Sequence, residues 1–390
     1  MKELRRIAVV TGTRADYGLL RGLLACVRDD PDLQLQILAT GAHLSPEFGL
    51  SYREIEADGF AIDAKIDMLL SSDSPAGVTK SMGVGLIGFA DALARLQPDV
   101  LVVLGDRFEA LVAAQAAAIA RIRVAHIHGG ETSEGAIDES LRHAISKLAH
   151  LHFVAAEPYR RRVIQMGESP AQVFNVGAPG LDGLQGMRWL SGSDLSAVLG
   201  LPLKKRPLFL VTYHPATLGD MPPKLAMAEL LAGLDRFADA GVVFTYPNAD
   251  AGGRELIAMI NDYVAAHKQR MCAVASLGSM RFLSLMREAD VVIGNSSSGL
   301  TEAPALKRAS VNIGDRQKGR LKAESVIDAA ESRDAIAQAI TKALSPAFQG
   351  GVANTVSLYG EGGASAKIVA QLKAALPPLQ KHFHDINHGI

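Results

Sequence analysis

The sequence predicts an α/β protein with two Rossmann-like, doubly wound domains in series that face a cleft. Strand-length apolar runs alternate with helix-period segments, the alternation restarts after a stretch with scattered Gly, Pro and Ser, and 390 residues exceed the usual size of a single hydrophobic core. Because most of these runs are apolar throughout, we expect parallel sheets covered by helices on both faces.

The first domain is predicted over residues 1–178. Its strands are the runs RIAVVTG, LQLQILATG, DVLVVLGD, VAHIHGG, LHFVAA and VFNVGAP, and its helices include EALVAAQAAAIARI and DESLRHAISKLAHL. Residues 179–206 combine Gly, Pro and Ser with weak periodicity, so we expect them to connect the two domains.

The second domain is predicted over residues 207–363, with strands in PLFLVTYHPAT, GVVFTYPNAD, MCAVASLG, DVVIGNSSSG and ASVNIGDR. A final helix over residues 364–376 precedes a polar tail, 377–390, whose His382, His384 and His388 are expected to be solvated rather than metal-bound. In sheets of this kind ligands bind beyond the carboxyl ends of the strands. The residues that follow each strand are therefore the candidate functional residues.

Composition argues against several classes of function. A formal net charge of −1, from 40 basic and 41 acidic residues, lacks the positive field that nucleic-acid binding requires. No apolar run approaches membrane-spanning length, and the N-terminus has no signal-peptide hydrophobic region. Cys26 and Cys272 indicate neither a disulfide nor a thiolate metal site. We expect a cytoplasmic protein without nucleic-acid or membrane partners.

Two glycine-containing motifs differ in what they predict. The spacing of Gly83, Gly85 and Gly88 matches a dinucleotide fingerprint, but the preceding residues are polar and form no strand, so the match is not interpreted as a cofactor site. GNSSSG, residues 294–299, follows a strand and precedes a helix expected to begin near Gly299. Ser296, Ser297 and the helix N-terminus could hold a diphosphate, and a serine cap without ligand is the alternative.

Charged side chains follow three other strands. Arg14 comes after the first strand and could clamp phosphate, Asp106 and Arg107 directly follow the apolar run VLVVL, and His214 occupies the equivalent place in the second half. Each charge is either solvated at the sheet edge or directed into the cleft. From its position, His214 could donate to phosphate or transfer a proton.

The segment HIHGGETSEGAIDES, residues 126–140, gathers acid/base groups beyond a strand end. His126 and His128 are predicted to share one strand face, and with His150 and His152 they could form a four-histidine metal site. Asp138 could act purely as a helix cap. We favour proton transfer by carboxylates such as Glu131, because Gly129 and Gly130 permit close approach of a ligand.

Taken together, TGTRADYGLL, GDRFEAL, HIHGGETSEGAIDESLRHAISKLAHLHF, HPAT, YPNADAGG, GNSSSGLTEAP and NIGDRQKGR resemble the hydrolysing UDP-N-acetylglucosamine 2-epimerases of sialic and legionaminic acid biosynthesis. The resemblance implies a GT-B-like fold, with the final helix crossing back to the first domain. It implies that UDP-N-acetylglucosamine and water become N-acetylmannosamine and UDP, by elimination of UDP and then hydration. It also implies a homodimer that needs neither a cofactor nor a metal.

The resemblance implies a role for each candidate residue. Asp106 and Asp138 would be acid/base carboxylates, and His214 would contact the phosphates or assist their departure. The remaining candidates would bind substrate: Arg14, Ser296 and Ser297 the diphosphate, Glu302 the ribose, and Asn248, Asp250 and Arg316 the sugar and nucleotide pocket. Arg107 is a further candidate for binding the nucleotide or the sugar.

The sequence departs from the family at one catalytic position. Where many members have His-Ile-Glu-Gly-Gly, this chain has His128, and one extra residue precedes Asp138. Either His128 transfers the proton, or Glu131 or Glu134 takes the role. The alternatives are the same chemistry on UDP-2,4-diacetamido-2,4,6-trideoxyglucose or a GDP-linked sugar, a non-hydrolysing epimerase, a glycosyltransferase, and a non-catalytic nucleotide-sugar sensor.

Overall fold

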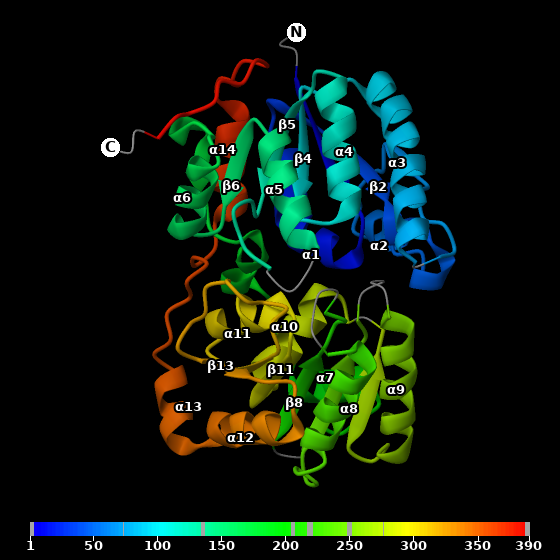
Figure 1. Ribbon diagram of the computed structural model, residues 1–390, viewed down its shortest axis with the longest axis vertical. Coiled ribbons are helices and arrows are strands. Elements are labelled where there is room, and N and C mark those ends of the chain that lie inside the picture. The colour runs from blue at the N-terminus through cyan, green and yellow to red at the C-terminus, as the bar shows by residue number, and fades with distance from the viewer. Residues whose placement is uncertain are drawn as a thin grey trace. The chain divides into compact units, whose positions relative to one another are not determined.

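The computed structural model describes residues 4–72, 74–133, 137–203, 207–216, 221–247, 252–275 and 277–386 (Figure 1). The chain divides into two compact units. The first comprises Met1–Glu131, Asp138–Gln185 and Tyr359–Ile390, and the second comprises Thr132–Ile137 and Gly186–Leu358.

The first unit is built on a seven-stranded parallel sheet in the order β3-β2-β1-β4-β5-β6-β7. Its strands are β1 (Arg5–Thr11), β2 (Leu33–Thr40), β3 (Ala64–Ile66), β4 (Val100–Leu104), β5 (Arg123–Ile127), β6 (Leu151–Val154) and β7 (Val173–Asn175). In β1, Ile7 and Val9 pack into one core cluster, and Ala8 and Val10 pack into another. Both faces are thus buried, which explains why the run is apolar throughout.

Helices cover both faces of this sheet (Figure 1). They are α1 (Arg14–Arg28), α2 (Tyr52–Ala57), α3 (Pro75–Leu96), α4 (Phe108–Ile119), α5 (Asp138–Leu148), α6 (Glu157–Gln165) and α14 (Ala364–Lys373). The last of these, α14, packs against α1, and its Ile368 shares a core cluster with Leu20. Asp182 accepts hydrogen bonds from the backbone N–H groups of Ala364 (2.7 Å) and Ser365 (2.6 Å), which fixes the start of α14 on the first unit.

The segment after α14 also contacts the first unit. Arg123 Nε donates to the carbonyl oxygen of Pro377 (2.6 Å). Nε2 of His150 lies 3.2 Å from the carbonyl oxygen of Leu379. Lys381 Nζ lies 2.8 Å from the carboxylate of Glu168, which is buried. His382 is exposed and His384 half-buried, while His388 lies outside the described residues.

The three glycines of the fingerprint-like run lie inside α3, where Gly83 faces open space and the other two are packing positions. A Cβ at Gly85 would lie 2.8 Å from Cε of Met68, and one at Gly88 would lie 2.7 Å from Cγ2 of Ile66. Glycine at these positions lets the helix approach β3 closely.

The second unit contains a six-stranded parallel sheet in the order β10-β9-β8-β11-β12-β13. Its strands are β8 (Leu208–Thr212), β9 (Gly241–Thr245), β10 (Met271–Val274), β11 (Val291–Gly294), β12 (Ala309–Ile313) and β13 (Val326–Ala329). Its helices are α7 (Gly192–Leu199), α8 (Pro223–Leu234), α9 (Gly253–Ala266), α10 (Gly278–Glu288), α11 (Glu302–Ala305), α12 (Arg333–Leu344) and α13 (Pro346–Val352). Within the stretch expected to be a connection, α7 packs Leu195 and Leu199 into a core cluster of this unit.

In each sheet the strand order reverses between two central strands, β1 and β4 in the first unit and β8 and β11 in the second. Loops leaving neighbouring strands at such a switch point diverge to opposite faces, and the space beyond their carboxyl ends is the usual ligand site. The predicted fold class, α/β with two doubly wound parallel sheets, is confirmed. The short strands β3 and β13 were not predicted.

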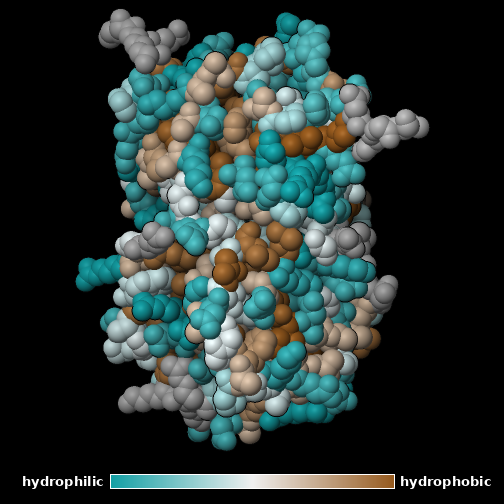
Figure 2. All heavy atoms as spheres, turned by 90° about the vertical axis from the view of Figure 1, so that its left-hand side faces the viewer, coloured by the Kyte–Doolittle hydropathy of each residue, from teal (hydrophilic) through white to brown (hydrophobic). Residues whose placement is uncertain are grey.

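The surface is mixed in character. Hydrophilic and apolar side chains are interspersed over the face shown in Figure 2. Within the described residues, none of the helices combines the length and the hydropathy that crossing a membrane requires.

Candidate functional site

The loops after β1 and β4 carry a buried charged network. Arg107 forms an ion pair with Glu109 (3.3 Å), which is buried, and both charges act on Asp16. Asp16 closes a capping box at the start of α1 with Thr13. Burial raises the pKa of Asp16, with Arg107 opposing the shift and Glu109 adding to it. Arg14, the first residue of α1, ion-pairs with Glu54 (2.8 Å).

Asp106 lies in the turn that follows β4, and its carboxylate is bound by Arg142 of α5. Arg142 is fully buried. It also donates to the carbonyl oxygen of Glu131 (3.0 Å) and to the Glu139 carboxylate (3.2 Å). One guanidinium thereby ties the loop after β4 to the loop after β5, through the planar fork of donors that arginine provides.

His128 and Glu131 form a hydrogen-bonded pair directly after β5. Nδ1 of His128 lies 2.5 Å from Oε1 of Glu131, with 15% of the histidine side chain and 3% of the glutamate side chain exposed. Because a carboxylate only accepts hydrogen bonds, Nδ1 carries the proton, and Nε2 of a neutral ring is then a base. The expectation that His126 and His128 share a strand face is wrong. The strand ends at Ile127, and His128 adopts a left-handed φ of 65° that redirects its ring.

Asp138 is the first residue of α5 and is partly buried. Arg142 follows it by one turn on the same helix. Glu134, named with Glu131 as an alternative acid, lies outside the described residues.

In the second unit, His214 and Arg316 meet at Asn295. The Asn295 side chain accepts from the backbone N–H of His214 (2.7 Å) and donates to its carbonyl oxygen (2.8 Å), joining the ends of β8 and β11. Arg316 (3.1 Å) and Gln317 (2.8 Å) both donate to the carbonyl oxygen of Asn295. A cationic side chain and an imidazole therefore lie at the switch point of this sheet.

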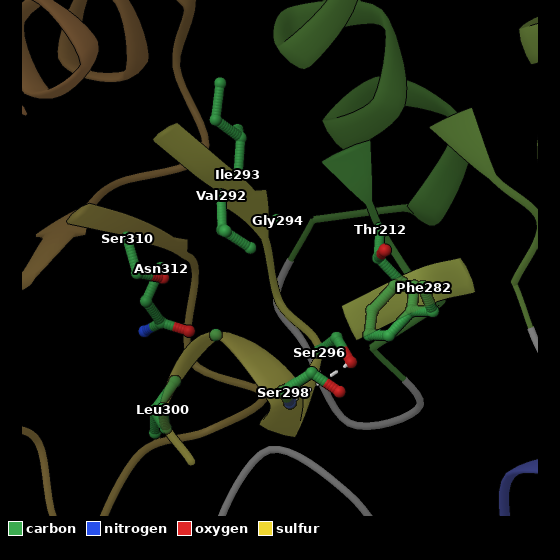
Figure 3. A pocket seen from close by; sticks show the side chains of 11 residues that line it. Thr212, Phe282, Val292, Ile293, Gly294, Ser296, Ser298, Leu300, Ser310 and Asn312 are labelled. Carbon is green, nitrogen blue, oxygen red and sulfur yellow. Dashed lines mark hydrogen bonds between the residues drawn. The ribbon is translucent and has the colours of Figure 1, made fainter. Parts of the chain in front are cut away.

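The serine run directly follows Asn295 in the chain, and Ser296 and Ser298 lie beyond the end of β11 (Figure 3). Ser296 caps a short 3-10 turn, Ser297–Gly299, and accepts from the backbone N–H of Ser298 (3.4 Å). With Thr212 and Asn312, Ser296 and Ser298 line a small pocket. The helix expected to begin near Gly299 starts instead at Glu302, and α11 spans only four residues, with Glu302 buried in its first turn. Pro304 cannot donate a helical hydrogen bond, which suits a helix of one turn.

Asn248 and Asp250, predicted to line the sugar and nucleotide pocket, lie outside the described residues. Of the other candidates, the first unit brings together Asp106, His128 and Glu131, and the second brings together His214, Arg316 and Ser296. Ser297 follows Ser296 directly in the 3-10 turn.

The four histidines of the metal-site alternative have other partners. Nε2 of His126 lies 2.6 Å from the carbonyl oxygen of Gly105 and Nδ1 lies 3.1 Å from Oγ of Ser146, while Nε2 of His152 lies 3.0 Å from the Glu168 carboxylate. Burial lowers the pKa of His126 to about 3 and lowers that of His152 as well. Among the described residues, no group of three or more His, Cys, Asp or Glu is arranged to hold a metal ion.

Sequence reasoning missed residues that act through other residues. Arg142 was not among the predicted site residues, although an arginine flanked by helical apolar positions could have indicated burial. Asn295 and Gln317 lie inside the motifs GNSSSG and GDRQKGR, yet nothing in the sequence indicated that they bridge two loops. Glu109 was likewise not singled out.

Comparisons with known proteins agree on one family. Residues 25–373 match the family model described as UDP-N-acetylglucosamine 2-epimerase. The chain is 44% identical over 324 residues to the GDP/UDP-N,N'-diacetylbacillosamine 2-epimerase (hydrolyzing) of Campylobacter jejuni, covering 83% of this chain and 84% of that one. It is 36% identical to the UDP-N,N'-diacetylbacillosamine 2-epimerase (hydrolyzing) of Legionella pneumophila, covering 95% of this chain and 96% of that one.

The fold resembles that of solved structures of this kind. The crystal structure of UDP-GlcNAc 2-epimerase from Neisseria meningitidis bound to UDP-GlcNAc matches with a TM-score of 0.81 at 18% identity, covering 94% of this chain and 99% of that one. At this identity the likeness establishes the two-sheet, GT-B-like fold.

Proposed function

The chain belongs to the UDP-N-acetylglucosamine 2-epimerase family of nucleotide-sugar 2-epimerases, and from this we propose that it is a hydrolysing epimerase. It eliminates the nucleoside diphosphate from a 2-acetamido sugar and then adds water. The C1–O bond breaks while the C2 proton is removed, which gives a 2-acetamidoglucal and the free diphosphate. Water then adds at C1 with protonation of C2 on the opposite face, and the products are a free 2-epimeric sugar and the nucleoside diphosphate.

The observation that carries this proposal is the hydrogen-bonded pair of His128 and Glu131, which Arg142 links to Asp106 through the carbonyl oxygen of Glu131. Removing the C2 proton and returning one from the other face requires two proton-transfer groups. In our proposal, Glu131 orients the His128 ring and stabilises its charged form, so that Nε2 transfers one proton. Asp106, aligned by Arg142, or Asp138 transfers the other.

We assign diphosphate binding to the residues after β8 and β11. The developing charge on the leaving group needs donors aimed at it, and a cationic side chain, hydroxyls and backbone N–H groups are such donors. The positions of His214, Arg316 and Ser296 around Asn295 support this role. The expectation includes Ser297 and Arg14 as further diphosphate ligands, Arg107 as a substrate ligand and Glu302 as the ribose ligand. Asn248 and Asp250 are kept as predicted pocket residues.

For the substrate, the relatives change the order of preference. The sequence favoured UDP-N-acetylglucosamine, with the 2,4-diacetamido sugar as the alternative. Because both relatives reported above carry names that specify N,N'-diacetylbacillosamine, we propose a nucleotide-linked 2,4-diacetamido-2,4,6-trideoxy sugar first, and UDP-N-acetylglucosamine second. A homodimer and a cytoplasmic location remain predictions, and light scattering of the purified protein tests the first.

The test is proton NMR of the purified protein in deuterated buffer with EDTA, with UDP- and GDP-linked 2,4-diacetamido sugars and UDP-N-acetylglucosamine supplied separately. We expect free, C2-deuterated 2-epimeric sugar together with the nucleoside diphosphate. A product that keeps its nucleotide would indicate a non-hydrolysing epimerase. Binding without reaction of all three would refute the proposal and favour the sensor.

A further inference from the structure

The residue before Asp106 is held by β5 on two sides. Gly105 has a left-handed φ of 78°, and its N–H donates to the carbonyl oxygen of Ile127 (2.9 Å). Its own carbonyl oxygen lies 2.6 Å from Nε2 of His126. Consecutive residues of β5 therefore hold both backbone polar groups of Gly105, and with them the peptide groups on either side of this residue. Through these bonds β5 orients the chain where it enters Asp106.

The His126 ring is itself fixed by α5. It is fully buried, and its Nδ1 lies 3.1 Å from Oγ of Ser146, which is also fully buried. The Gly105 carbonyl can only accept a hydrogen bond, so Nε2 carries the proton and Nδ1 accepts from the serine hydroxyl. A Cβ at Gly129 would lie 3.0 Å from both Nδ1 and Oγ, so the glycine after His128 packs directly over this hydrogen bond.

The same face of α5 holds the side chain of Asp106. Arg142 precedes Ser146 by one helical turn, and residues at this spacing lie on one face. Arg142 binds the Asp106 carboxylate, while Ser146 reaches the Gly105 carbonyl through His126. The helix thus holds both the side chain of Asp106 and the backbone that precedes it.

From this geometry we propose that His126 is a positioning residue that orients Asp106 by holding the Gly105 carbonyl, with Ser146 selecting the ring tautomer. The proposal rests on the proposed function, in which Asp106 transfers a proton. Burial lowers the pKa of His126 to about 3, so the ring stays neutral and keeps one donor and one acceptor throughout the working pH range. A purely apolar side chain would fill this site without either hydrogen bond.

The test compares His126→Gln with His126→Met, two side chains of similar length and shape. Glutamine retains a donor for Gly105 and an acceptor for Ser146, whereas methionine retains neither. We expect kcat to fall by about 100-fold in His126→Met, because small misplacements of a catalytic group have effects of that size. KM should change little, and His126→Gln should recover most of the lost kcat. Val27→Ala, which truncates a buried side chain of α1 in the core cluster that this helix shares with the sheet, controls for lost stability.

Hydrogen–deuterium exchange over residues 104–108 provides a readout that needs no substrate. We expect faster exchange in His126→Met than in His126→Gln or Val27→Ala. Equal kcat and equal exchange in the two His126 variants would overturn the proposal. It would also be overturned if Val27→Ala, at the same Tm as His126→Met, lost as much kcat as that variant. If the wild type turns over no nucleotide sugar while exchange still distinguishes the two variants, the proposed function fails and the positioning role stands.

Discussion

Lowering the pH from 7 to 5 should destabilise the first unit, because this unit holds buried histidines in their neutral form. Burial lowers the pKa of His126 to about 3, and burial together with the charge of Arg14 lowers that of His43 to about 4. The ordinary value of 6.5 applies after unfolding. Between these values the unfolded chain binds more protons than the folded one. This contribution to stability is therefore complete above pH 6.5 and is lost as the pH falls.

The size of the loss follows from proton linkage. At pH 5 an unfolded histidine is almost fully protonated, while folded His126 stays neutral, so each such group lowers the unfolding free energy by about 2 kcal/mol relative to pH 7. His126 and His43 together would contribute about 4 kcal/mol. Other titrating groups, such as Asp16, act equally in the wild type and in a variant of His126. The difference between wild type and His126→Gln therefore isolates one histidine.

The assay is urea unfolding at pH 5, 6 and 7, followed by circular dichroism. The chain has a single tryptophan, Trp189, which belongs to the second unit, so its fluorescence reports that unit separately. Between pH 7 and 5, His126→Gln should lose about 2 kcal/mol less than the wild type in the transition that Trp189 does not report. His267→Gln, in the second unit, should leave that transition unchanged. Equal losses in wild type and His126→Gln would refute the argument.

Three further outcomes are expected. His128→Ala and Asp138→Asn should each lower turnover by at least about 100-fold and retain UDP binding, which calorimetry measures. Wild-type turnover in both variants would contradict the proton-transfer roles assigned to these residues. Ser296→Ala should weaken UDP binding by about 10-fold through loss of a hydrogen bond to a charged group, and unchanged affinity would remove this serine from the diphosphate site. Lys381→Met should destabilise the first unit by about 2 kcal/mol, because buried Glu168 loses a charged donor. An unchanged urea midpoint at pH 7 would show that the ion pair between Lys381 and Glu168 does not stabilise this unit.

The sequence predicted the sheets well, because strands buried on both faces are apolar throughout. The two strands that it missed, β3 and β13, have only three and four residues and end their sheets. In β3 the exposed Lys65 interrupts the apolar pattern, so too little signal remains to separate a short edge strand from a loop. The helix that contains Glu302 was predicted to begin too early for a similar reason, because four residues are too few to show a helical periodicity.

For the candidate site, the sequence predicted which residues follow the strands, but it did not predict which side chains contact one another. That Asp106 and His214 follow central strands is visible in the order of residues, because each apolar run ends just before them. That Arg142 binds Asp106 is not visible, because 36 residues separate them and the contact depends on how α5 packs beside the loop after β4. The direction of His128 was mispredicted because alternation holds only within a strand, and β5 ends one residue earlier.

The resemblance implies a glutamate where this chain has His128, and the neighbouring Glu131 gives a chemical reason for the proposed exchange. Two carboxylates at the distance that separates His128 from Glu131 would repel each other, and one of them would have to stay protonated. An imidazole in one of the two positions turns that repulsion into a charge-assisted hydrogen bond. The carboxylate then fixes the tautomer of the ring and stabilises the imidazolium that forms when Nε2 takes a proton. In our proposal, His128 therefore takes the proton-transfer role of the glutamate that the resemblance implies at this position, and the acid three residues later holds it in place.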